Sequence, residues 1–325
     1  MQKLSIGGIT FDANAFLAPM AGYTDKVYRS ICLKQGAALA YTEMVSAEGL
    51  ARNSANTEAL MARGDGERIL AVQLFMPDAD TASRCVPNLM KAKPDLIDIN
   101  CGCPVPKVVK TGAGSALLKK PSVIHDIVKV LISETGLPVT VKIRTGWDKE
   151  SINYLETAEA AFSAGASALC MHARTRSQLY LPSAEWEHLA KLKASFCDKV
   201  IIGSGDLFTA DDGRRMMEQT GIDAVAFARG AIGNPFIFRQ FNEDWTPSPK
   251  EIADMAALHL DGLIGLYGER TACREMRKHI CAYVKGIRGG SKIRQEANKA
   301  ECRADYLKAL SVLSPELVHQ DSSCN

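Results

Sequence analysis

Short apolar runs rich in Val, Ile and Ala alternate with longer segments in which apolar side chains recur every three or four positions. The short runs predict buried strands, and the longer segments predict amphipathic helices. A hairpin is predicted at residues 4–15, and strands at 16–20, 38–44, 69–75, 96–100, 139–144, 168–172, 200–204 and 224–228. Helices are predicted at 25–35, 122–134, 152–164, 185–196 and 210–220, and segment 45–66 is expected to be a long loop with a short helix.

Glycines stand where several of these helices should end. Gly36, Gly136, Gly165 and Gly221 each follow a predicted helix, and glycine readily adopts the left-handed conformation that closes a helix C-terminus. Eight strands that alternate with helices predict a TIM (β/α)8 barrel, an α/β fold. A doubly wound open sheet is the alternative. No Gly-x-Gly-x-x-Gly fingerprint follows the first strand, however, which argues against a dinucleotide-binding half.

The pattern changes after Phe241. Trp245, Pro247 and Pro249 interrupt the chain, and no further strand is predicted. Helices are expected at 251–266, 272–285 and 296–313, with a turn at 288–291 before the last one. We therefore expect residues 1–241 to form the barrel and residues 242–325 to form a smaller all-helical domain.

Positive charge concentrates in this second region. The net charge of the chain is only +2, but residues 271–308 contain ten Lys and Arg against four Asp and Glu, a local charge of +6 that leaves −4 for the rest. A basic helical region on a mildly acidic body predicts a polyanionic partner at that end. A solvated helix face is the alternative.

Composition sets further bounds. The chain has 325 residues, 46% of them hydrophobic, which is enough for a core of barrel size. The first residues, MQKLSIGGITFDANAF, contain no apolar signal segment, and no run approaches the ~18 apolar residues of a membrane span. We expect a cytoplasmic protein with no membrane contact, and a monomer. The ten cysteines show no zinc spacing and predict reduced thiols without a metal site; they are residues 32, 85, 101, 103, 170, 197, 273, 281, 302 and 324.

One stretch, residues 95–118, combines a strand, two thiols and a cationic loop. The apolar run at 96–100 ends in Asn100-Cys101-Gly102-Cys103-Pro104, and a glycine-rich loop with Lys107 and Lys110 follows. A thiol at the carboxyl end of a buried strand, beside a basic loop, indicates the mouth of an active site. The alternative is that both cysteines are small buried hydrophobes.

Polar residues follow most of the other predicted strands as well. In a TIM barrel the reactive groups come from the carboxyl ends of several strands, so these residues are expected to converge. Together with the smaller or apolar residues beside them, the candidates at the strand ends are Pro19, Met20, Ala21, Gln73, Asn100, Cys103, Lys142, Arg144, His172, Arg174, Arg176, Ser204, Gly205, Asp206, Ala228 and Arg229. For Lys142 a solvated lysine is the alternative, and for His172 a satisfied core histidine.

The loops after the last two strands fit a phosphate group. Glycines allow backbone N–H groups to approach phosphate oxygens at Gly203-Ser204-Gly205-Asp206, and Arg229 adds a bidentate positive charge. Barrels commonly bind phosphate with these two loops and a short extra helix, which Gly233-Asn234-Pro235 could begin. Ordinary tight turns are the alternative.

Taken together, these residues resemble the dihydrouridine synthase family, which are flavin-dependent TIM barrels that reduce uridine in tRNA, and most closely its bacterial DusB branch. The matching stretches cover the whole barrel in order, and the helical domain also matches the family's layout to about residue 315. They are APMAGYTD (18–25), DINCGCP (98–104), GSALL (114–118), VKIRTGW (141–147), MHARTR (171–176), SGD (204–206) and GNPFIF (233–238).

The resemblance implies a mechanism and a set of roles. Non-covalent FMN, reduced by NADPH, would pass a hydride to C6 of a uracil, and Cys103 would donate a proton to C5. Asn100 and Arg144 would hold the uracil edge. The RNA itself would be contacted by Arg174, Arg176, Arg277 and Lys278. The expected RNA is tRNA, and ribosomal RNA is the alternative. The cofactor would be bound by Pro19, Met20, Ala21, Gln73, Lys142, His172, Ser204, Gly205, Asp206, Ala228 and Arg229.

Two positions depart from the family pattern. Ser204 stands where an Asn is usual, and Ala228 stands where a Gly is usual before Arg229. Both residues are small, so flavin binding is expected to persist. A small-molecule flavin oxidoreductase of the dihydroorotate dehydrogenase type is the alternative function, although it would not need a basic helical domain. A non-enzymatic RNA-binding module is a second alternative.

Overall fold

The computed structural model of the chain describes residues 3–317, so Cys324 lies outside the described residues. The chain divides into two compact units, Met1–Gly230 and Ala231–Asn325. The predicted boundary after Phe241 lies later in the chain than this division, because the short helix α10 (Ile237–Asn242) belongs to the second unit.

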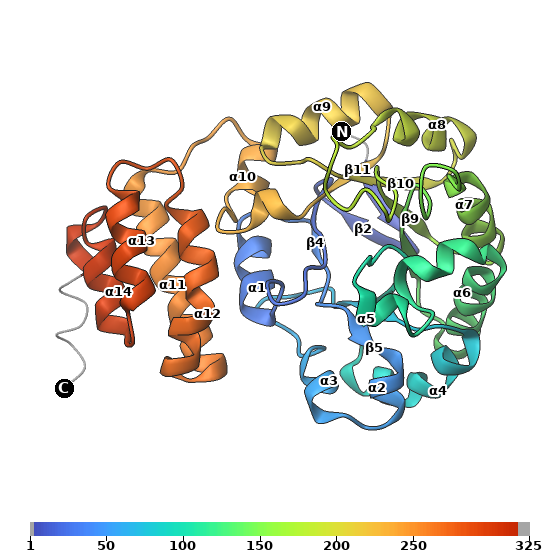
Figure 1. The fold of residues 1–325 in the computed structure, drawn as a ribbon, viewed down its shortest axis with the longest axis horizontal. Coiled ribbons are helices and arrows are strands. Elements are labelled where there is room, and N and C mark those ends of the chain that lie inside the picture. The colour runs from blue at the N-terminus through green and yellow to red at the C-terminus, as the bar shows by residue number, and fades with distance from the viewer. Residues whose placement is uncertain (1–2, 318–325) are drawn as a thin grey trace. The chain divides into compact units, whose positions relative to one another are not determined.

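The first unit is a barrel of parallel strands ringed by helices (Figure 1). The strand order is β4-β3-β11-β10-β9-β8-β7-β6-β5, and a parallel bridge between Tyr41 and Ala71 joins the β4 side of the sheet to β6, which closes the barrel. This confirms the predicted TIM barrel. The strands are β3 Ala15–Leu17, β4 Leu39–Ala40, β5 Val45–Ser46, β6 Ala71–Phe75, β7 Leu96–Asn100, β8 Val139–Arg144, β9 Ala168–His172, β10 Val200–Ser204 and β11 Ala224–Phe227.

All five predicted helices of the barrel are present, as α1 Lys26–Lys34, α6 Pro121–Thr135, α7 Tyr154–Ser163, α8 Glu187–Ser195 and α9 Ala210–Thr220. The pattern did not predict α4 (Ala79–Leu89), although its buried Ala82, Cys85, Val86 and Leu89 recur at helical spacing, because the internal Pro87 argues against a helix. Segment 45–66 holds two short helices rather than one, α2 Ala47–Ala51 and α3 Ala55–Ala59. Short helical turns complete the unit at α5 Pro106–Val109, η1 Met90–Ala92, η2 Gly114–Lys119 and η3 Arg229–Ala231.

Local sequence explains where several of these helices begin and end. The Asp25 carboxylate accepts hydrogen bonds from the backbone N–H groups of Val27 and Tyr28 at the start of α1. Gly136 and Gly221 have φ angles of 68° and 69° at the ends of α6 and α9, a conformation that glycine adopts without a steric penalty. These caps set the length of each helix and return the chain to the next strand.

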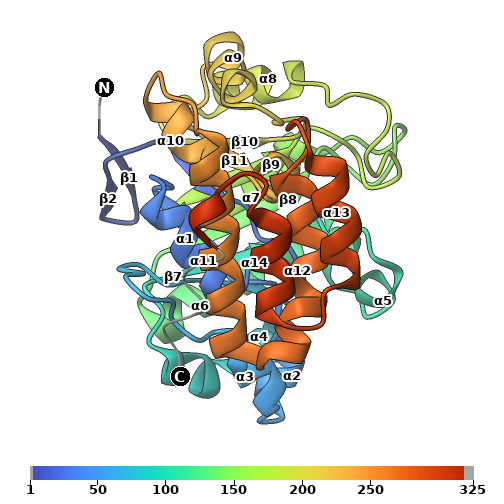
Figure 2. The ribbon, with the colours of Figure 1, turned by 90° about the vertical axis from the view of Figure 1, so that its left-hand side faces the viewer.

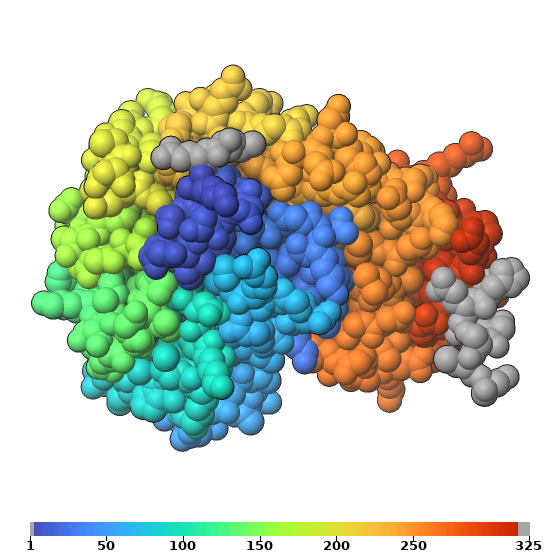
Figure 3. Space-filling model, turned by 180° about the vertical axis from the view of Figure 1, so that it is seen from behind, coloured from blue at the N-terminus to red at the C-terminus, as the bar shows by residue number. Residues whose placement is uncertain are grey.

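An antiparallel hairpin, β1 (Leu4–Ile6) and β2 (Ile9–Phe11), covers the amino-terminal end of the barrel. Its apolar side chains pack into the core cluster that includes Ala168 and Ala224, at the starts of their strands. At the turn, a Cβ on Gly7 would lie 2.1 Å from Cβ of Pro138, so the hairpin rests directly on the chain before β8. Figure 3 shows this hairpin in darkest blue across the rear face of the barrel unit. That end of the barrel is therefore closed and apolar.

The inside of the barrel changes from apolar to polar along the strands. Near their starts, inward side chains such as Leu96 and Ala168 belong to the apolar cluster. Near their ends, pairing aligns Asn100 with Lys142, Arg144 with His172, and His172 with Ser204. Because parallel strands end at one edge of the sheet, these polar residues meet at the carboxyl-terminal mouth.

The second unit is entirely helical within the described residues, and Figure 2 shows its longer helices side by side. They are α11 Pro249–Tyr267, α12 Glu269–Tyr283, α13 Gly290–Lys299 and α14 Arg303–Leu310. The single helix predicted at 296–313 was wrong, because the backbone is extended at Ala300 and α14 starts anew with a capping interaction between Cys302 and Asp305. Asn234 is also not the cap of α10, which begins after Phe236.

No helix among residues 3–317 is both long enough and apolar enough to cross a membrane.

Candidate active site

Cys103 lies in the loop that leaves β7, and its backbone is held from below by Asn100. The Asn100 Oδ1 atom accepts hydrogen bonds from the backbone N–H groups of Gly102, at 3.2 Å, and Cys103, at 2.8 Å. Gly114 closes the same loop, because a Cβ there would lie 2.9 Å from the carbonyl oxygen of Cys103. Partial burial raises the pKa of the Cys103 thiol, although Val105, Arg144 and Lys142 oppose the shift. The thiol is thus protonated at neutral pH.

A chain of buried hydrogen bonds continues below Asn100. Its Nδ2 donates to Oε1 of Gln73 at 2.8 Å, and Nε2 of Gln73 donates to Oδ2 of Asp98 at 2.6 Å. The Thr140 hydroxyl donates to the other oxygen of Asp98 at 2.6 Å. Because a carboxylate only accepts hydrogen bonds, Asp98 determines which way the amides of Gln73 and Asn100 point. Burial raises the pKa of Asp98 to about 6, against the hydrogen bonds from Gln73 and Thr140.

Lys142 and His172 stand at the same mouth, on β8 and β9. The half-buried Lys142 amine makes no hydrogen bond or ion pair with any of residues 3–317. Burial lowers the pKa of His172 well below its usual value, and the charges of Arg144, Lys142 and Arg174 add to this shift. The site therefore offers an available cation beside a neutral imidazole.

Two arginines predicted to touch the substrate are buried in the mouth and hold backbone groups. Arg144 donates from Nε to the carbonyl oxygen of Gly102 at 3.0 Å and from Nη1 to those of Thr175 and Leu179. Its Nη2 makes no hydrogen bond within the described chain, so one edge of the guanidinium remains for a substrate.

Arg174 is only 2% exposed and donates to Asp206, at 2.6 Å, and to the carbonyl oxygen of Pro182, at 2.7 Å. It therefore lies inside the barrel wall. Arg174 thus holds a loop of the mouth. Its contact with the RNA stays a prediction.

The two predicted phosphate loops pack against each other. Asp206, at a positive φ of 56°, accepts hydrogen bonds from Arg174, Arg229 and the Ala184 N–H. Gly205 must be glycine, since a Cβ would lie 2.9 Å from the His172 ring. The Ser204 hydroxyl donates to the carbonyl oxygen of Ala226 at 3.0 Å. Arg229 is part exposed and lies over the rings of Tyr180 and Phe208, at 4.5 and 4.9 Å.

The remaining predicted residues of the barrel occupy two places. Pro19, Met20 and Ala21 form the turn after β3, in which the carbonyl oxygen of Met20 accepts hydrogen bonds from Tyr23 and Thr24. Arg176 stacks on the indole of Trp147 at 4.6 Å, with Lys119 at 3.6 Å from the same ring.

Arg277 and Lys278 lie on α12 of the helical unit. Arg277 is partly buried and donates to the carbonyl oxygen of Ala300, while Lys278 pairs with Glu275. Both side chains are thus already engaged, whereas Arg274, Lys285 and Arg288 of the same basic region are exposed. Lys292 is exposed as well and lies 3.9 Å from Glu296.

Sequence reasoning missed several residues of the mouth. Asp98 and Thr140 precede Asn100 and Lys142 by two residues on β7 and β8, so their side chains point to the same inward face of the barrel. This period of two could have identified them from the sequence. Tyr180, Phe208 and Trp147 come from loops, and nothing in their local sequence indicated which side chains they would meet.

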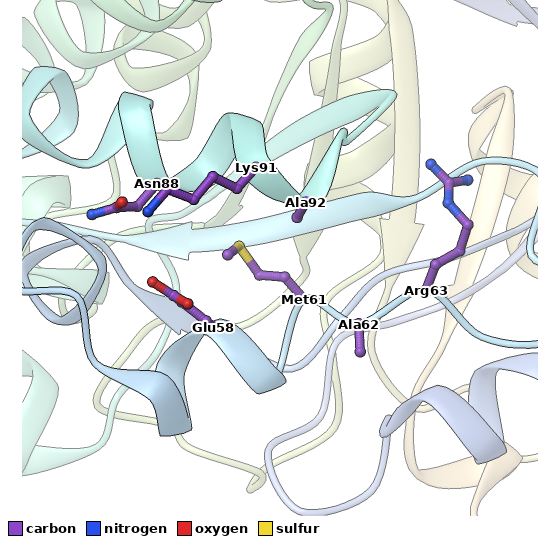
Figure 4. Close-up of a pocket in the computed structure, with 7 residues that line it drawn as sticks. All are labelled: Glu58, Met61, Ala62, Arg63, Asn88, Lys91 and Ala92. Carbon is purple, nitrogen blue, oxygen red and sulfur yellow. The ribbon is translucent and has the colours of Figure 1, made fainter.

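One cavity lies elsewhere. It has a volume of about 290 Å³ between α3, η1 and the end of α4, and Figure 4 shows Glu58 and Met61 directed toward Asn88 and Lys91. None of the predicted site residues lines it, and Arg63 beside it is already paired with Asp95 at 2.9 Å. This cavity is separate from the chemistry of the mouth.

Sequence comparison with known proteins points to one family. The sequence model described as dihydrouridine synthase (Dus) matches residues 16–317. A probable tRNA-dihydrouridine synthase of Treponema pallidum (strain Nichols) is 41% identical over 97% of this chain and 97% of its own. The tRNA-dihydrouridine synthase B of Vibrio cholerae is 35% identical over 94% of this chain and 97% of its own.

Solved structures with low sequence identity share the fold alone. Morphinone reductase has a TM-score of 0.55 at 13% identity, over 74% of this chain and 88% of its own. A variant of NCR from Zymomonas mobilis has a TM-score of 0.53 at 15% identity, over 78% of this chain and 94% of its own.

Proposed function

Because this chain belongs to the dihydrouridine synthase family, we propose that it reduces the C5–C6 double bond of specific uridines in tRNA. The reductant is NADPH and the cofactor is non-covalently bound FMN. The observation that carries the proposal is the convergence of Cys103, Asn100, Lys142, Arg144 and His172 at one mouth of the barrel. We also propose that the protein acts in the cytoplasm and as a monomer.

Cys103 is proposed as the proton donor. Reduction of the double bond requires a hydride at C6 and a proton at C5, and a bound flavin would supply the hydride that it takes from NADPH. A general acid must be protonated before the reaction, and the raised pKa of the Cys103 thiol meets this condition. The thiolate that remains is reprotonated from solvent, and Lys142 and Arg144 stabilise its charge meanwhile.

The residues of the mouth fit a flavin and its phosphate. Arg229 and the amides of residues 204–206 and 228–230 provide a cation and donors of the kind that bind phosphate. The free amine of Lys142 suits the electron-rich edge of a reduced ring, and neutral His172 can donate one hydrogen bond. Pro19, Met20, Ala21 and Gln73 would line the remaining wall. Ser204 and Ala228 are small enough to leave this space open.

Binding of RNA is proposed to use both units. Asn100, through its second Nδ2 hydrogen, and Arg144, through Nη2, would hold the uracil edge. Arg176, Arg277 and Lys278 would contact phosphates, together with the exposed cations of residues 271–308. Each phosphate contact removed by an alanine substitution should reduce the salt dependence of RNA binding by a slope of about 0.7–0.9.

The test is a comparison of RNA from cells with and without this gene. Dihydrouridine is quantified separately in tRNA and ribosomal RNA by mass spectrometry. Loss of dihydrouridine at defined tRNA positions, restored by the wild-type gene, is the expected result. Unchanged dihydrouridine in tRNA, or loss confined to ribosomal RNA, would contradict the proposed substrate.

A further inference from the structure

Three large apolar side chains in a row are exposed on the loop between β9 and α8. Leu179 is 49% exposed, Tyr180 51% and Leu181 81%, and Leu181 is the most exposed large apolar residue of the described chain. We call these three residues the tip. Their exposure contributes nothing to folding, since apolar surface stabilises a protein only when it leaves water. A contiguous exposed apolar patch of this kind marks an interaction site.

The tip is held in place by buried groups of the barrel. Arg144 Nη1 donates to the carbonyl oxygen of Leu179 at 3.1 Å, and Arg174 Nε donates to that of Pro182 at 2.7 Å. The Leu181 N–H donates to the carbonyl oxygen of Gln178 at 2.9 Å. Leu179 has a φ of 49°, in the left-handed region that leucine rarely adopts. The loop therefore presents its apolar side chains in a defined conformation.

Arg144 also connects the tip to the loop that carries the proposed proton donor, Cys103. Arg144 donates from Nε to the carbonyl oxygen of Gly102, next to Cys103, and from Nη1 to Leu179. One guanidinium thus spans the distance between the catalytic loop and the tip. On its other side the tip borders Arg229, whose guanidinium carbon lies 4.5 Å from the centre of the Tyr180 ring. An apolar surface bordered by cations, at the edge of a reaction site, suits nucleobases attached to a phosphate backbone.

We infer that the tip is a wedge that enters the RNA stack where the target uridine leaves it. This inference rests on the proposed function, because a uridine must be unstacked to lie in the barrel mouth, and unstacking costs free energy. Proteins that open a stack insert apolar side chains between bases to replace the lost contacts. Leu181 would fill the vacated space, and Tyr180 would stack on a neighbouring base.

The experiment compares Leu181→Ser with wild type on two substrates. One is a pool of dihydrouridine-free tRNA folded with Mg²⁺, and the other is the same pool cut to short single strands. The expected result is a loss of about tenfold in kcat/KM on folded tRNA, with at most a two- to threefold loss on the fragments, which have little stacking to open. Leu181→Met should restore most of the activity. Tyr180→Ala should follow the same pattern.

Two controls test whether the loss of activity is specific to the tip. Leu155→Ser removes an exposed apolar side chain, 41% exposed, from the outer helix α7 and should change neither substrate's kinetics. Flavin content and NADPH oxidation without RNA should be unchanged in Leu181→Ser.

Three results would overturn the inference. Equal losses on both substrates would assign the tip to general RNA binding. Slower NADPH oxidation would assign it to the nicotinamide or flavin site, and unchanged kinetics on folded tRNA would leave it as a surface for a protein partner. A wild-type protein that makes no dihydrouridine in either substrate would instead refute the proposed function itself.

Discussion

The two ends of the barrel are built from the same strands but differ in the polarity of their inward side chains. At the amino-terminal end a hairpin closes the opening, and Leu4, Ile6 and Phe11 fill it with apolar side chains. At the carboxyl-terminal end the opening is lined by polar groups whose orientations are determined by hydrogen bonds, such as that from the Cys103 N–H to Asn100. Position along a strand thus decides whether an inward side chain contributes to stability or to chemistry.

The largest expected effect is at the carboxyl-terminal end. Cys103→Ala should lower the rate of dihydrouridine formation by about 10²–10⁴-fold, the usual contribution of a general acid. Reduction of the bound flavin by NADPH should persist, because it does not need the thiol. Stopped-flow flavin bleaching and dihydrouridine formation, measured on the same sample, separate the two steps.

The matched control is Cys101→Ala. Cys101 is fully buried, and burial raises its pKa well above the usual range, so it should act only in packing. This variant should lose some stability and keep its activity. If Cys101→Ala were inactive and Cys103→Ala active, the assignment of the proton donor would be wrong.

The next effect concerns the amino-terminal end. Phe11→Ala should lower the free energy of unfolding by about 3–5 kcal/mol, because it empties a buried site next to Phe16. Activity per folded molecule should not change, since the hairpin lies at the far end from Cys103. Denaturant unfolding and kcat on folded protein measure both quantities. Thr10→Ala, at an exposed position of the same strand, is the control, and a change in kcat for Phe11→Ala would show that the two ends are coupled.

A smaller effect is expected at Asp98, which lies between the two ends of the barrel. In the folded chain the pKa of Asp98 is raised from its ordinary value of 3.8 to about 6. The protonated form therefore favours folding below pH 3.8, and this contribution is lost as the pH rises through about 6. With pKa values of this size the loss amounts to about 3 kcal/mol.

Asp98→Asn removes this titration and can still accept the hydrogen bond from Gln73. Relative to wild type, the variant should gain stability as the pH rises from about 4 to about 8. Unfolding free energies of both proteins across this range provide the test. A difference that stays constant with pH would mean that Asp98 remains charged in the fold, held by Lys142 and its hydrogen-bond donors.

The smallest effect is again expected at the carboxyl-terminal mouth of the barrel. Arg229→Ala should weaken flavin binding by roughly 1.5–3 kcal/mol, the size of a charge-assisted hydrogen bond. Stability of the flavin-free protein should fall by less than ~1 kcal/mol, because the Arg229–Asp206 ion pair is part exposed. Flavin titration followed by fluorescence measures the affinity. Arg239→Ala, which breaks an exposed pair with Glu243 in the helical unit, should leave flavin affinity unchanged.

Sequence by itself determined the order of strands and helices and the residues at the strand ends. A period of two or of 3.6 residues, with glycines at the helix ends, is a local property, and the barrel follows from eight such units. The exceptions were also local, since Pro87 argues against a helix at α4 despite its apolar period, and the break at Ala300 has no proline or glycine to mark it. Lys142 and His172 were recognisable for the same reason, because each lies near the carboxyl end of a strand.

Only the tertiary structure decided what these side chains do. Arg144 and Arg174 look alike in sequence as cations at strand ends, yet both are buried and hold carbonyl groups of Gly102, Leu179 and Pro182. The partners of Arg144 lie far from it along the chain. The burial that raises the pKa of Asp98 arises only when such distant segments meet. The same is true of the exposure of Leu181.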